Sequence, residues 1–270
     1  MAVPDVSDRS LAELLSLEGR VAVVTGGAVG IGYAIAGRLA EAGAAVLLAD
    51  LHDTTEPAAE LARRTGARVL GTHLDVADAD SIVAAADFAV ERLGGLDIWV
   101  NNAGIYPSTP LLDLTDASWD TVLDVNLRGS FIGARESARR MVAAGHGGVI
   151  VNIASTAGYQ AGGPGVAHYV SSKHAVRGLT KSLAVELGPH GIRALAVAPT
   201  LIETPGIEAG RDAFRAAGLG DMLDTYGQRL ALGRVGVADD VARVVLFAAS
   251  DLALFMTGST LLVDAGDVAL

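Results

Sequence analysis

The stretch TGGAVGIG, residues 25–32, decides the fold because it stands where a buried strand gives way to a helix. Before it, residues 19–27 form a β-branched apolar run that ends in glycine, which is typical of a buried strand. After it, residues 30–43 show apolar side chains on one helical face and end at Gly43. Glycines at such a junction permit a tight turn and let the backbone N–H groups of the helix start face a pyrophosphate.

The glycine spacing in this turn is G-x-x-x-G-x-G rather than the dinucleotide pattern G-x-G-x-x-G. An ordinary glycine-rich turn would give the same letters, so the motif by itself is weak evidence. Its place between the first strand and the first helix favours nucleotide binding. The candidate cofactor-binding residues here are Gly26, Gly30, Ile31 and Gly32.

The same alternation of apolar runs and helical patterns continues along the chain. We expect further strands at 44–50, 67–75, 96–104, 147–155, 192–199 and 259–266, and further helices at 56–66, 81–93, 117–144, 169–187 and 239–249. Strands that are apolar throughout and separated by helices predict a parallel sheet covered on both faces. The expected fold class is therefore α/β, a doubly wound three-layer α/β/α sandwich of the Rossmann type.

Two segments stand outside this alternation. Residues 1–18 form an N-terminal arm, in which SLAELL can make one helical turn. Residues 200–236 separate a strand from the last helix, and an insertion of that length in a compact domain is often a substrate lid. The sequence shows no linker or repeat, so we expect residues 19–270 to form a single catalytic domain.

Composition excludes several functions. The formal net charge is −11 and the sequence has no Lys/Arg run, which argues against nucleic acid as a partner. No apolar run is long enough to span a bilayer, and the polar, acidic N-terminus is unlike a signal peptide, so a cytoplasmic protein without membrane contact is expected. The absence of cysteine excludes disulfides, thiolate catalysis and cysteine-ligated metal.

Asp50 ends the second predicted strand, where a carboxylate can accept both ribose hydroxyls of an adenosine. It would repel a 2′-phosphate at the same place. The glycine loop contains no Lys or Arg, and neither do the three residues after Asp50, which are Leu51, His52 and Asp53. The sequence therefore favours NAD over NADP, although a turn aspartate would look the same.

Two further strand ends carry candidate cofactor contacts. Asp75 and Val76 follow the third strand, and an aspartate there can bond an adenine amino group or cap the next helix. The small residues of NNAG, Asn102, Ala103 and Gly104, let a ligand lie against the backbone of the fourth strand end. A structural role for the asparagines is the alternative.

The stretch HYVSSKHA, residues 168–175, places Tyr169 and Lys173 four residues apart on one helical face. A nearby ammonium favours phenolate, so we expect a lowered tyrosine pKa and proton exchange with an alcohol or ketone oxygen. This spacing often arises by chance. Ser155 ends the preceding strand at the same sheet edge and could hold the substrate oxygen, and Asn126 could hold a water behind Lys173.

Together, TGGAVGIG, NNAG, DVNLRGSF, NIAS, YVSSK and MTGSTLLVDAG give the chain a resemblance to the short-chain dehydrogenase/reductase family from about Leu17 to Gly266. The resemblance implies about seven parallel strands and a homotetramer, with a homodimer as the alternative. It also implies that Tyr169 is the general acid/base, that Lys173 lowers its pKa and binds the nicotinamide ribose, and that Ser155 polarises the substrate carbonyl.

The resemblance extends to the rest of the predicted site. It implies that Asn126 anchors a proton-relay water, that residues 102–104 lie beside the adenosine ribose, and that Pro199 and Thr204 contact the nicotinamide. The family usually has Pro-Gly where this chain has Pro199-Thr200, so a reshaped nicotinamide pocket is expected.

The substrate side is less well defined by the sequence. Tyr159 and Gln160 lie in the loop that normally lines the substrate site, and we predict that they bind substrate together with Ser155 and Tyr169. Arginines 211, 215 and 229 in the lid could meet an anionic substrate, but solvated helix charges are the more common case. Histidines 168 and 174 lack ligand-spaced partners and are expected on the helix surface or pocket wall, with no metal.

These observations predict an NAD(H)-dependent oxidoreductase that interconverts a small-molecule secondary alcohol and a ketone by hydride transfer. Two alternatives stay open. One is a catalytically silent NAD(H)-binding regulator on the same fold. The other is an epimerase or dehydratase that retains its NAD.

Overall fold

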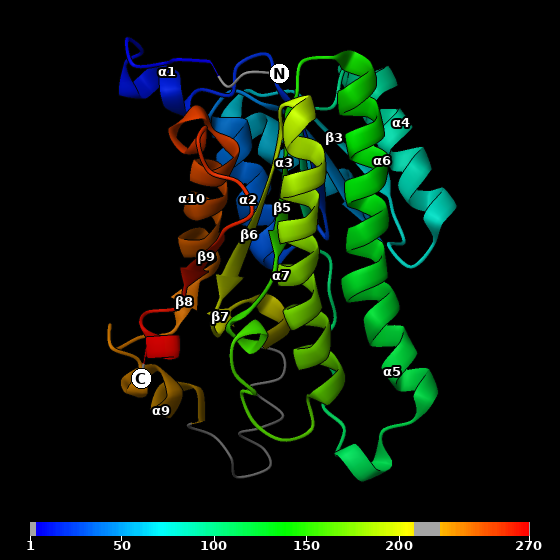
Figure 1. Cartoon of the computed structure of the whole chain (residues 1–270), viewed down its shortest axis with the longest axis vertical. Coiled ribbons are helices and arrows are strands. Elements are labelled where there is room, and N and C mark those ends of the chain that lie inside the picture. The colour runs from blue at the N-terminus through cyan, green and yellow to red at the C-terminus, as the bar shows by residue number, and fades with distance from the viewer. Residues whose placement is uncertain (1–3, 208–221, 270) are drawn as a thin grey trace.

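The computed structural model describes residues 4–207 and 222–269, and its centre is a seven-stranded sheet in which all neighbouring strands are parallel (Figure 1). The strand order is β3-β2-β1-β4-β5-β6-β9, so the chain moves outward from β1 in one direction and then crosses back to move outward in the other. The strands are β1 (Val21–Thr25), β2 (Ala45–Asp50), β3 (Val69–His73), β4 (Ile98–Asn101), β5 (Gly148–Ile153), β6 (Ile192–Pro199) and β9 (Thr260–Val263). The predicted α/β doubly wound fold is confirmed.

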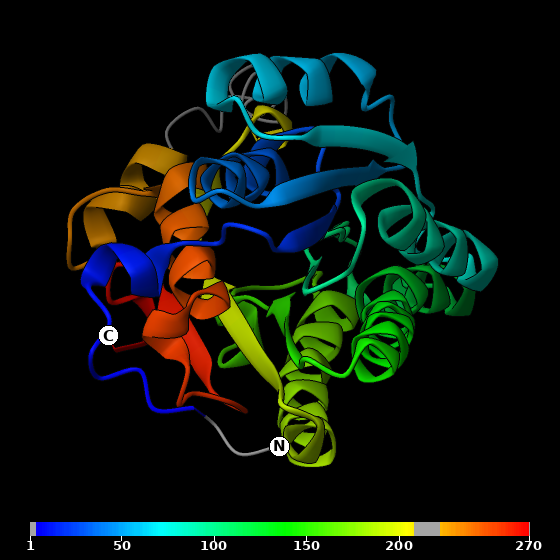
Figure 2. The same ribbon diagram turned by 90° about the horizontal axis from the view of Figure 1, so that it is seen from above.

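Helices cover both faces of this sheet (Figure 2). One layer holds α2 (Gly30–Glu41), α3 (Thr55–Thr65) and α10 (Ala238–Ala249), and the other holds α4 (Ala79–Leu93), α5 (Asp116–Leu123), α6 (Gly129–Ala144) and α7 (Ala167–Leu187). Alternate strand residues supply the two cores, since Val46 and Leu48 pack with the first layer and Leu47 and Ala49 with the second. This double burial explains why the strands are apolar throughout.

The long helix predicted over 117–144 is interrupted. A π-helical turn, Asp124–Arg128, separates α5 from α6 and contains the fully buried Asn126. Such single wide turns inside α-helices are frequently found at functional sites, because the extra residue redirects a side chain. Hydrophobic periodicity does not reveal it, since the helix continues in the same direction on both sides.

The segment between β6 and α10 has structure at both ends. Strand β7 (Ile202–Glu203) pairs in parallel with β8 (Gly236–Val237), and α9 (Met222–Arg229) lies between them in the chain. Arg211 and Arg215, two of the three arginines considered for an anionic substrate, lie outside the described residues. The third, Arg229, ends α9 and is exposed.

The N-terminal arm forms the predicted helical turn, α1 (Leu11–Leu15), with Ser10 and Glu13 making a capping box. Asp251 fastens the arm to the 3-10 turn after α10. Its carboxylate lies 2.9 Å from Arg9 Nη1 and 2.6 Å from Arg20 Nη2. Among the described helices, none is long and apolar enough to cross a membrane.

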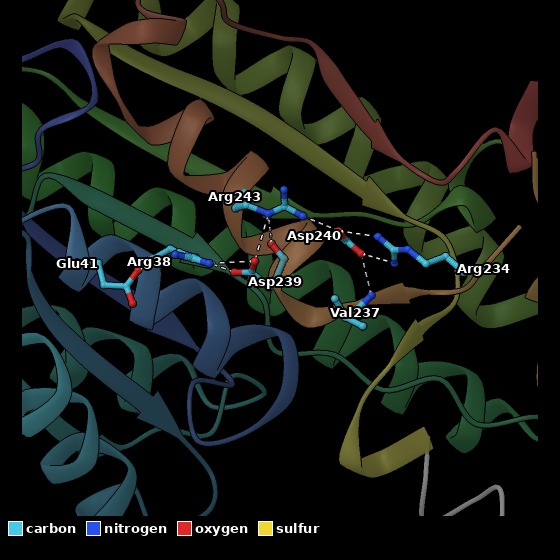
Figure 3. Close-up of polar contacts among 7 residues, drawn as sticks. All are labelled: Arg38, Glu41, Arg234, Val237, Asp239, Asp240 and Arg243. Atoms are coloured by element: carbon cyan, nitrogen blue, oxygen red, sulfur yellow. Dashed lines mark hydrogen bonds and ion pairs between the residues drawn. The ribbon is translucent and has the colours of Figure 1, made fainter. Parts of the chain in front are cut away.

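A charged network on the surface ties α10 to its neighbours (Figure 3). Asp239 accepts two hydrogen bonds from the guanidinium of Arg38 on α2, at 2.6 and 3.0 Å. Asp240 accepts from Arg234 at 2.7 Å and from Arg243 at 2.6 Å, and it also caps the helix start through the backbone N–H of Val237. The network therefore fixes the end of the 200–236 segment to the start of α10.

Candidate active site

The glycine loop at the end of β1 leaves no space for side chains. A Cβ at Gly32 would lie 2.0 Å from the carbonyl oxygen of Gly26, which no real structure tolerates. Gly26 has a φ of +63°, and a Cβ there would lie 3.0 Å from the Cα of Ala103. The two glycines are thus required by close backbone approach between the β1 and β4 loops.

The start of α2 suits a pyrophosphate. Its N-cap is Val29, and no side chain in the described parts of the chain caps the helix, so the first backbone N–H groups, including that of Ile31, remain available. Gly30, at φ +60°, faces Thr204, whose Cγ2 would lie 3.5 Å from a Cβ at that position. The loop residues therefore fit a dinucleotide. Thr204 lies beside the loop, and its contact with the nicotinamide stays a prediction.

Asp50 is buried at the end of β2 and already holds the glycine loop. One carboxylate oxygen accepts from the backbone N–H of Ala28 at 2.9 Å, and the other accepts from the backbone N–H of His52 at 2.9 Å. The exposed His52 ring places Nδ1 3.0 Å from the same second oxygen. A carboxylate has about four acceptor positions, so ribose binding can use the remaining one and displace the exposed ring. Its ribose role stays a prediction.

The asparagines of NNAG have the structural role that was kept as an alternative. Asn102 Nδ2 donates to the carbonyl oxygens of Thr25 at 2.9 Å and Gly26 at 3.0 Å. Thr25 Oγ1 in turn accepts from the backbone N–H groups of Asn102 and Ala103, both at 3.0 Å. These contacts clamp the β4 loop on the glycine loop, so any contact of residues 102–104 with the ribose is made by a preorganised backbone.

Asp75 is not a helix cap. Its Oδ1 accepts from the backbone N–H of Ala77 at 2.9 Å, while the N-cap of α4 is Asp78. The carbonyl of Val76 packs closely on Gly129, where a Cβ would lie 2.7 Å from that oxygen. The capping alternative is therefore wrong, and the adenine contact of Asp75 and Val76 stays a prediction.

Tyr169 and Lys173 lie on the same face of α7, as their spacing predicts. Lys173 Nζ is 5.7 Å from the centroid of the Tyr169 ring. The ammonium is buried and donates to the backbone carbonyl of Ile153 at 2.8 Å, at the end of β5. Burial lowers the pKa of Lys173 to about 8. The pair therefore stands at the sheet edge next to the β5 strand end.

The predicted lowering of the Tyr169 pKa is wrong for this arrangement. Burial raises the pKa of the phenol, a hydrogen bond with the Ser155 side chain works in the opposite direction, and the nearby phenol of Tyr106 raises it further. The ammonium of Lys173 is directed to the Ile153 carbonyl instead of the phenol oxygen. Spacing on a helix can place two side chains on one face but cannot show which acceptor the cation selects.

Ser155 lies where β5 ends, and its side chain connects strand and catalytic helix. The hydroxyl accepts from the backbone N–H of Ala157 at 3.1 Å, and it acts on the Tyr169 phenol by lowering the pKa of that group. It is buried, with 9% of its surface exposed. This hydroxyl therefore lies beside the phenol, where a substrate oxygen would have to bind both groups.

Asn126 faces the same loop as Lys173. Its side chain exchanges two 2.8 Å bonds with the backbone of Ile105, and its Nδ2 also lies 3.2 Å from Ser172 Oγ. A Cβ at Gly104 would lie 3.2 Å from Asn126 Oδ1 and 3.7 Å from Lys173 Nζ. The structure thus brings Asn126, Lys173 and the NNAG loop together, and the relay water stays a prediction.

The predicted substrate residues Tyr159 and Gln160 are less directly placed. The guanidinium of Arg177 stacks on the Tyr159 ring, 3.4 Å from its centroid, and donates to the Gly158 carbonyl. Tyr159 also packs on the small core cluster that contains Val176. Gln160 bonds through its backbone N–H to Thr156 at 3.1 Å. One face of Tyr159 is therefore covered, and substrate binding by these two residues stays a prediction.

Tyr106 is a site residue that the sequence reasoning missed. Its ring meets the Tyr169 ring edge-on, with centroids 6.3 Å apart, and 54% of its surface is exposed. A Cβ at Gly206 would lie 3.4 Å from its hydroxyl oxygen. It therefore spans from the catalytic phenol to the segment after β7. The sequence feature that could have identified Tyr106 is its position two residues after NNAG, at the edge of the sheet where the strands end.

The two histidines beside the catalytic pair differ. His174 is exposed, as expected, but His168 is fully buried, and its Nδ1 accepts from the backbone N–H of Tyr169 at 3.0 Å. His168 therefore does not lie on the helix surface, because the ring turns inward at the start of α7, and the pocket-wall position expected as the alternative stays a prediction. Within residues 4–207 and 222–269, no group of three or more His, Asp or Glu side chains could hold a metal.

Comparison with known proteins agrees with this geometry. A family model described as enoyl-(acyl carrier protein) reductase matches residues 26–267. Over 248 residues the chain is 41% identical to cis-4-hydroxycyclohexanecarboxylate dehydrogenase of Sinomonas cyclohexanicum, covering 92% of this chain and 96% of that protein. Over 253 residues it is 39% identical to L-2,3-butanediol dehydrogenase of Corynebacterium glutamicum, covering 92% and 98%.

A crystal structure from Agrobacterium tumefaciens that contains bound NADP superposes with a TM-score of 0.81, at 37% identity, covering 95% of this chain and 99% of that chain. The sheet order and the relatives named above identify an oxidoreductase with a Rossmann-like fold. The chain belongs to the short-chain dehydrogenase/reductase family. Its relatives include dehydrogenases of secondary alcohols, and the family supports a nicotinamide cofactor.

Proposed function

We propose that this protein is an NAD-dependent dehydrogenase that interconverts a small secondary alcohol and its ketone. The observation that carries the proposal is the Tyr169 phenol, whose pKa the neighbouring Ser155 hydroxyl lowers, while the buried Lys173 ammonium lies 5.7 Å from its ring centroid. A hydroxyl donor, a phenol and a cation at one sheet edge suit a substrate oxygen whose charge changes during reaction.

Each side chain has a defined task in this proposal. Ser155 holds the substrate oxygen against the phenol, and Tyr169 gives or takes its proton. Lys173 supplies positive charge behind the phenol, and Asn126 stabilises the loop at Gly104 that faces both. When bound, NAD supplies the carbon that accepts or donates the hydride, while the protein contributes orientation and electrostatics.

The protonation state of the Tyr169 phenol sets the expected pH dependence of the reaction. Because burial raises the pKa of Tyr169, the phenol is protonated near neutral pH and is ready to act as an acid toward a ketone. Alcohol oxidation needs the deprotonated form. Oxidation should therefore accelerate as pH rises above neutrality, and ketone reduction should slow over the same range.

The preference for NAD rests on Asp50. Its buried carboxylate lies beside the glycine loop, where a ribose 2′-phosphate would add a second negative charge. The exposed His52 ring lies beside this carboxylate, with Nδ1 3.0 Å from Oδ1, and no Lys or Arg stands among the three residues after Asp50. Charge repulsion thus supports NAD as the cofactor.

The substrate class is inferred from the site wall and from relatives. Tyr106 presents a half-exposed aromatic ring next to the phenol, which suits the apolar body of a compact alcohol. The two relatives named above are dehydrogenases of a hydroxycyclohexane carboxylate and of a butanediol. We therefore propose small cyclic and short-chain secondary alcohols as substrates.

A panel of such alcohols tests the proposal. The purified protein is assayed at pH 9 with NAD and with NADP against cyclohexanols, 2,3-butanediol, polyols, hydroxy acids and steroid alcohols, with NADH formation as the readout. Turnover with NAD on at least one secondary alcohol is expected. NADH binding without turnover on any of them would contradict it and favour the silent regulator. NAD that co-purifies with the protein, without net NADH formation, would favour the epimerase or dehydratase.

A further inference from the structure

A cluster of three hydroxyl and carboxylate groups lies at the end of β6, outside the catalytic residues described above. Asp267 Oδ2 accepts from Thr200 Oγ1 at 2.6 Å and from the Tyr226 hydroxyl at 2.8 Å. The two hydroxyl oxygens lie 3.0 Å from each other. Thr200 is the residue that replaces the glycine usual at this position in the family, so this departure has a specific partner.

The cluster joins three segments that are far apart in the sequence. Thr200 directly follows β6, Tyr226 lies on α9, and Asp267 begins the 3-10 turn Asp267–Ala269 near the C-terminus. Hydrogen bonds to a charged acceptor are stronger than neutral ones. One carboxylate oxygen therefore fastens the strand end, the α9 helix and the C-terminal turn to a common point.

The turn that presents Asp267 is itself tightly constrained. Ala265 has a φ of +51° and Gly266 a φ of +86°, which reverses the chain after β9. Asp264 holds this reversal by accepting from the backbone N–H groups of Gly266 at 3.1 Å and Val268 at 3.0 Å. Alanine seldom adopts this left-handed conformation, so surrounding contacts must stabilise it. The reversal directs the chain back toward Thr200.

Charge and protonation state are consistent with a stable cluster. Burial raises the pKa of the Tyr226 phenol, and the hydrogen bond to Asp267 acts in the same direction, while the contact with Thr200 and the cation of Arg229 oppose it without reversing it. The phenol therefore remains a donor across the physiological range. With both hydroxyl protons available, the carboxylate receives two donors from two different segments.

Thr200 connects the cluster to two predicted cofactor contacts. It directly follows Pro199, which is predicted to contact the nicotinamide, and it stands four residues before Thr204, which faces the glycine loop. Pro199 ends β6 and pairs with Val263 of β9. After Thr200 the chain forms β7 and then reaches Thr204, whose Cγ2 would lie 3.5 Å from a Cβ at Gly30. A shift at Thr200 is therefore transmitted along a short, paired segment to both sides of the dinucleotide site.

We propose that Asp267 is a positioning residue for the dinucleotide, acting through Thr200 and Tyr226; this rests on the proposed function. Its carboxylate fixes the strand end that carries Pro199 and the short β7 segment that carries Thr204. The C-terminal turn thereby determines cofactor affinity without touching the cofactor. The hydride and proton steps, which depend on Ser155, Tyr169 and Lys173, are not altered.

The experiment is a fluorescence titration of NADH into the full chain. Asp267→Ala should weaken NADH binding about tenfold, as expected for two lost bonds to a charged group. Asp267→Asn, which keeps one acceptor oxygen, should restore part of the affinity. Thr200→Val and Tyr226→Phe each remove one donor at nearly constant volume and should give intermediate losses that do not add in the double variant.

The matched control is Asp251→Ala, which removes a carboxylate that is also paired with two partners, Arg9 and Arg20, but beside α1 at the opposite end of the molecule (Figure 1). It should leave NADH affinity unchanged. Turnover at saturating NAD and its pH profile should stay at wild-type values in Asp267→Asn, while KM for NAD rises.

The outcomes separate the two proposals. If the wild-type chain binds neither NADH nor NADPH, the proposed function is wrong. If wild type binds and Asp267→Ala binds equally well, or if Asp251→Ala loses as much affinity, the positioning role is overturned. Should Asp267→Ala fail to fold, Asp267→Asn and Thr200→Val carry the same test, and unchanged affinity in both overturns it.

Discussion

The two sides of the sheet's carboxyl edge are built differently. On the β1–β4 side, the loops approach each other closely along the backbone, as where a Cβ at Gly26 would lie 3.0 Å from the Cα of Ala103. On the β5–β6 side, side chains from distant segments make the contacts, as where Asp267 accepts from Thr200 and Tyr226. The first side tolerates almost no change of residue size, whereas the second depends on individual polar groups. Substitutions on the two sides should therefore fail in different ways.

The largest effect is expected on the backbone side. Gly32→Val places a side chain where even a Cβ would lie 2.0 Å from the Gly26 oxygen, so the glycine loop cannot form. NADH binding should disappear, measured by fluorescence titration beside circular dichroism. The control is Gly178→Ala on α7, where a Cβ meets nothing within 4 Å, and its binding should equal that of wild type. Wild-type NADH affinity in Gly32→Val would contradict the conclusion that close packing forbids a side chain at this position.

On the side-chain side, Ser155→Ala should keep the fold and cofactor binding but lower turnover by roughly 10²-fold. The bond from Ser155 lowers the pKa of the Tyr169 phenol, so its loss should move the rise of alcohol oxidation to higher pH. A pH–rate profile measures this shift. Ser137→Ala is the control, because that buried hydroxyl donates only to the Ala134 carbonyl on α6. A profile that moves to lower pH would contradict the proposed contact.

Asp50 combines the two kinds of contact, since its side chain holds the backbone of the glycine loop. Asp50→Asn removes the negative charge and keeps an acceptor for the backbone N–H of Ala28. Relief of repulsion should raise the efficiency with NADP relative to NAD by roughly tenfold, corresponding to about 1.4 kcal/mol. Ratios of kcat/KM for the two cofactors test it. An unchanged ratio would show that another group selects the cofactor.

The smallest effect is expected away from the site, in the network of Figure 3. The bond from Arg234 holds the pKa of Asp240 at about 2, below its ordinary 3.8, so the carboxylate stabilises the fold above about pH 4 and this stabilisation is lost as pH falls toward 2. Asp240→Asn should lower the free energy of unfolding at pH 7 by about 1 kcal/mol or less, because its partners are largely exposed. Urea unfolding at pH 7 and pH 3 should show the difference shrinking, and a constant difference would contradict it.

The same contrast explains what the sequence could predict. The sheet, its helices and the glycine loop follow from periodicity and from glycines that local geometry requires, and they were confirmed. The π-turn at Asn126 and the buried position of His168 were not foreseen, because helical spacing is unchanged around them. The pKa direction of Tyr169 was wrong, because the Lys173 ammonium bonds to the Ile153 carbonyl. The Thr200–Tyr226–Asp267 cluster joins residues that are 26 to 67 positions apart, which no local pattern reveals.

The central claim is that Tyr169 exchanges the proton with the substrate oxygen. Tyr169→Phe keeps the ring that packs on Tyr106 and removes only the hydroxyl. Turnover of the best alcohol in the panel, followed by NADH formation, should fall by roughly 10²–10⁴-fold. NADH affinity in the same preparation should stay near the wild-type value. Turnover near the wild-type rate in Tyr169→Phe would contradict the account.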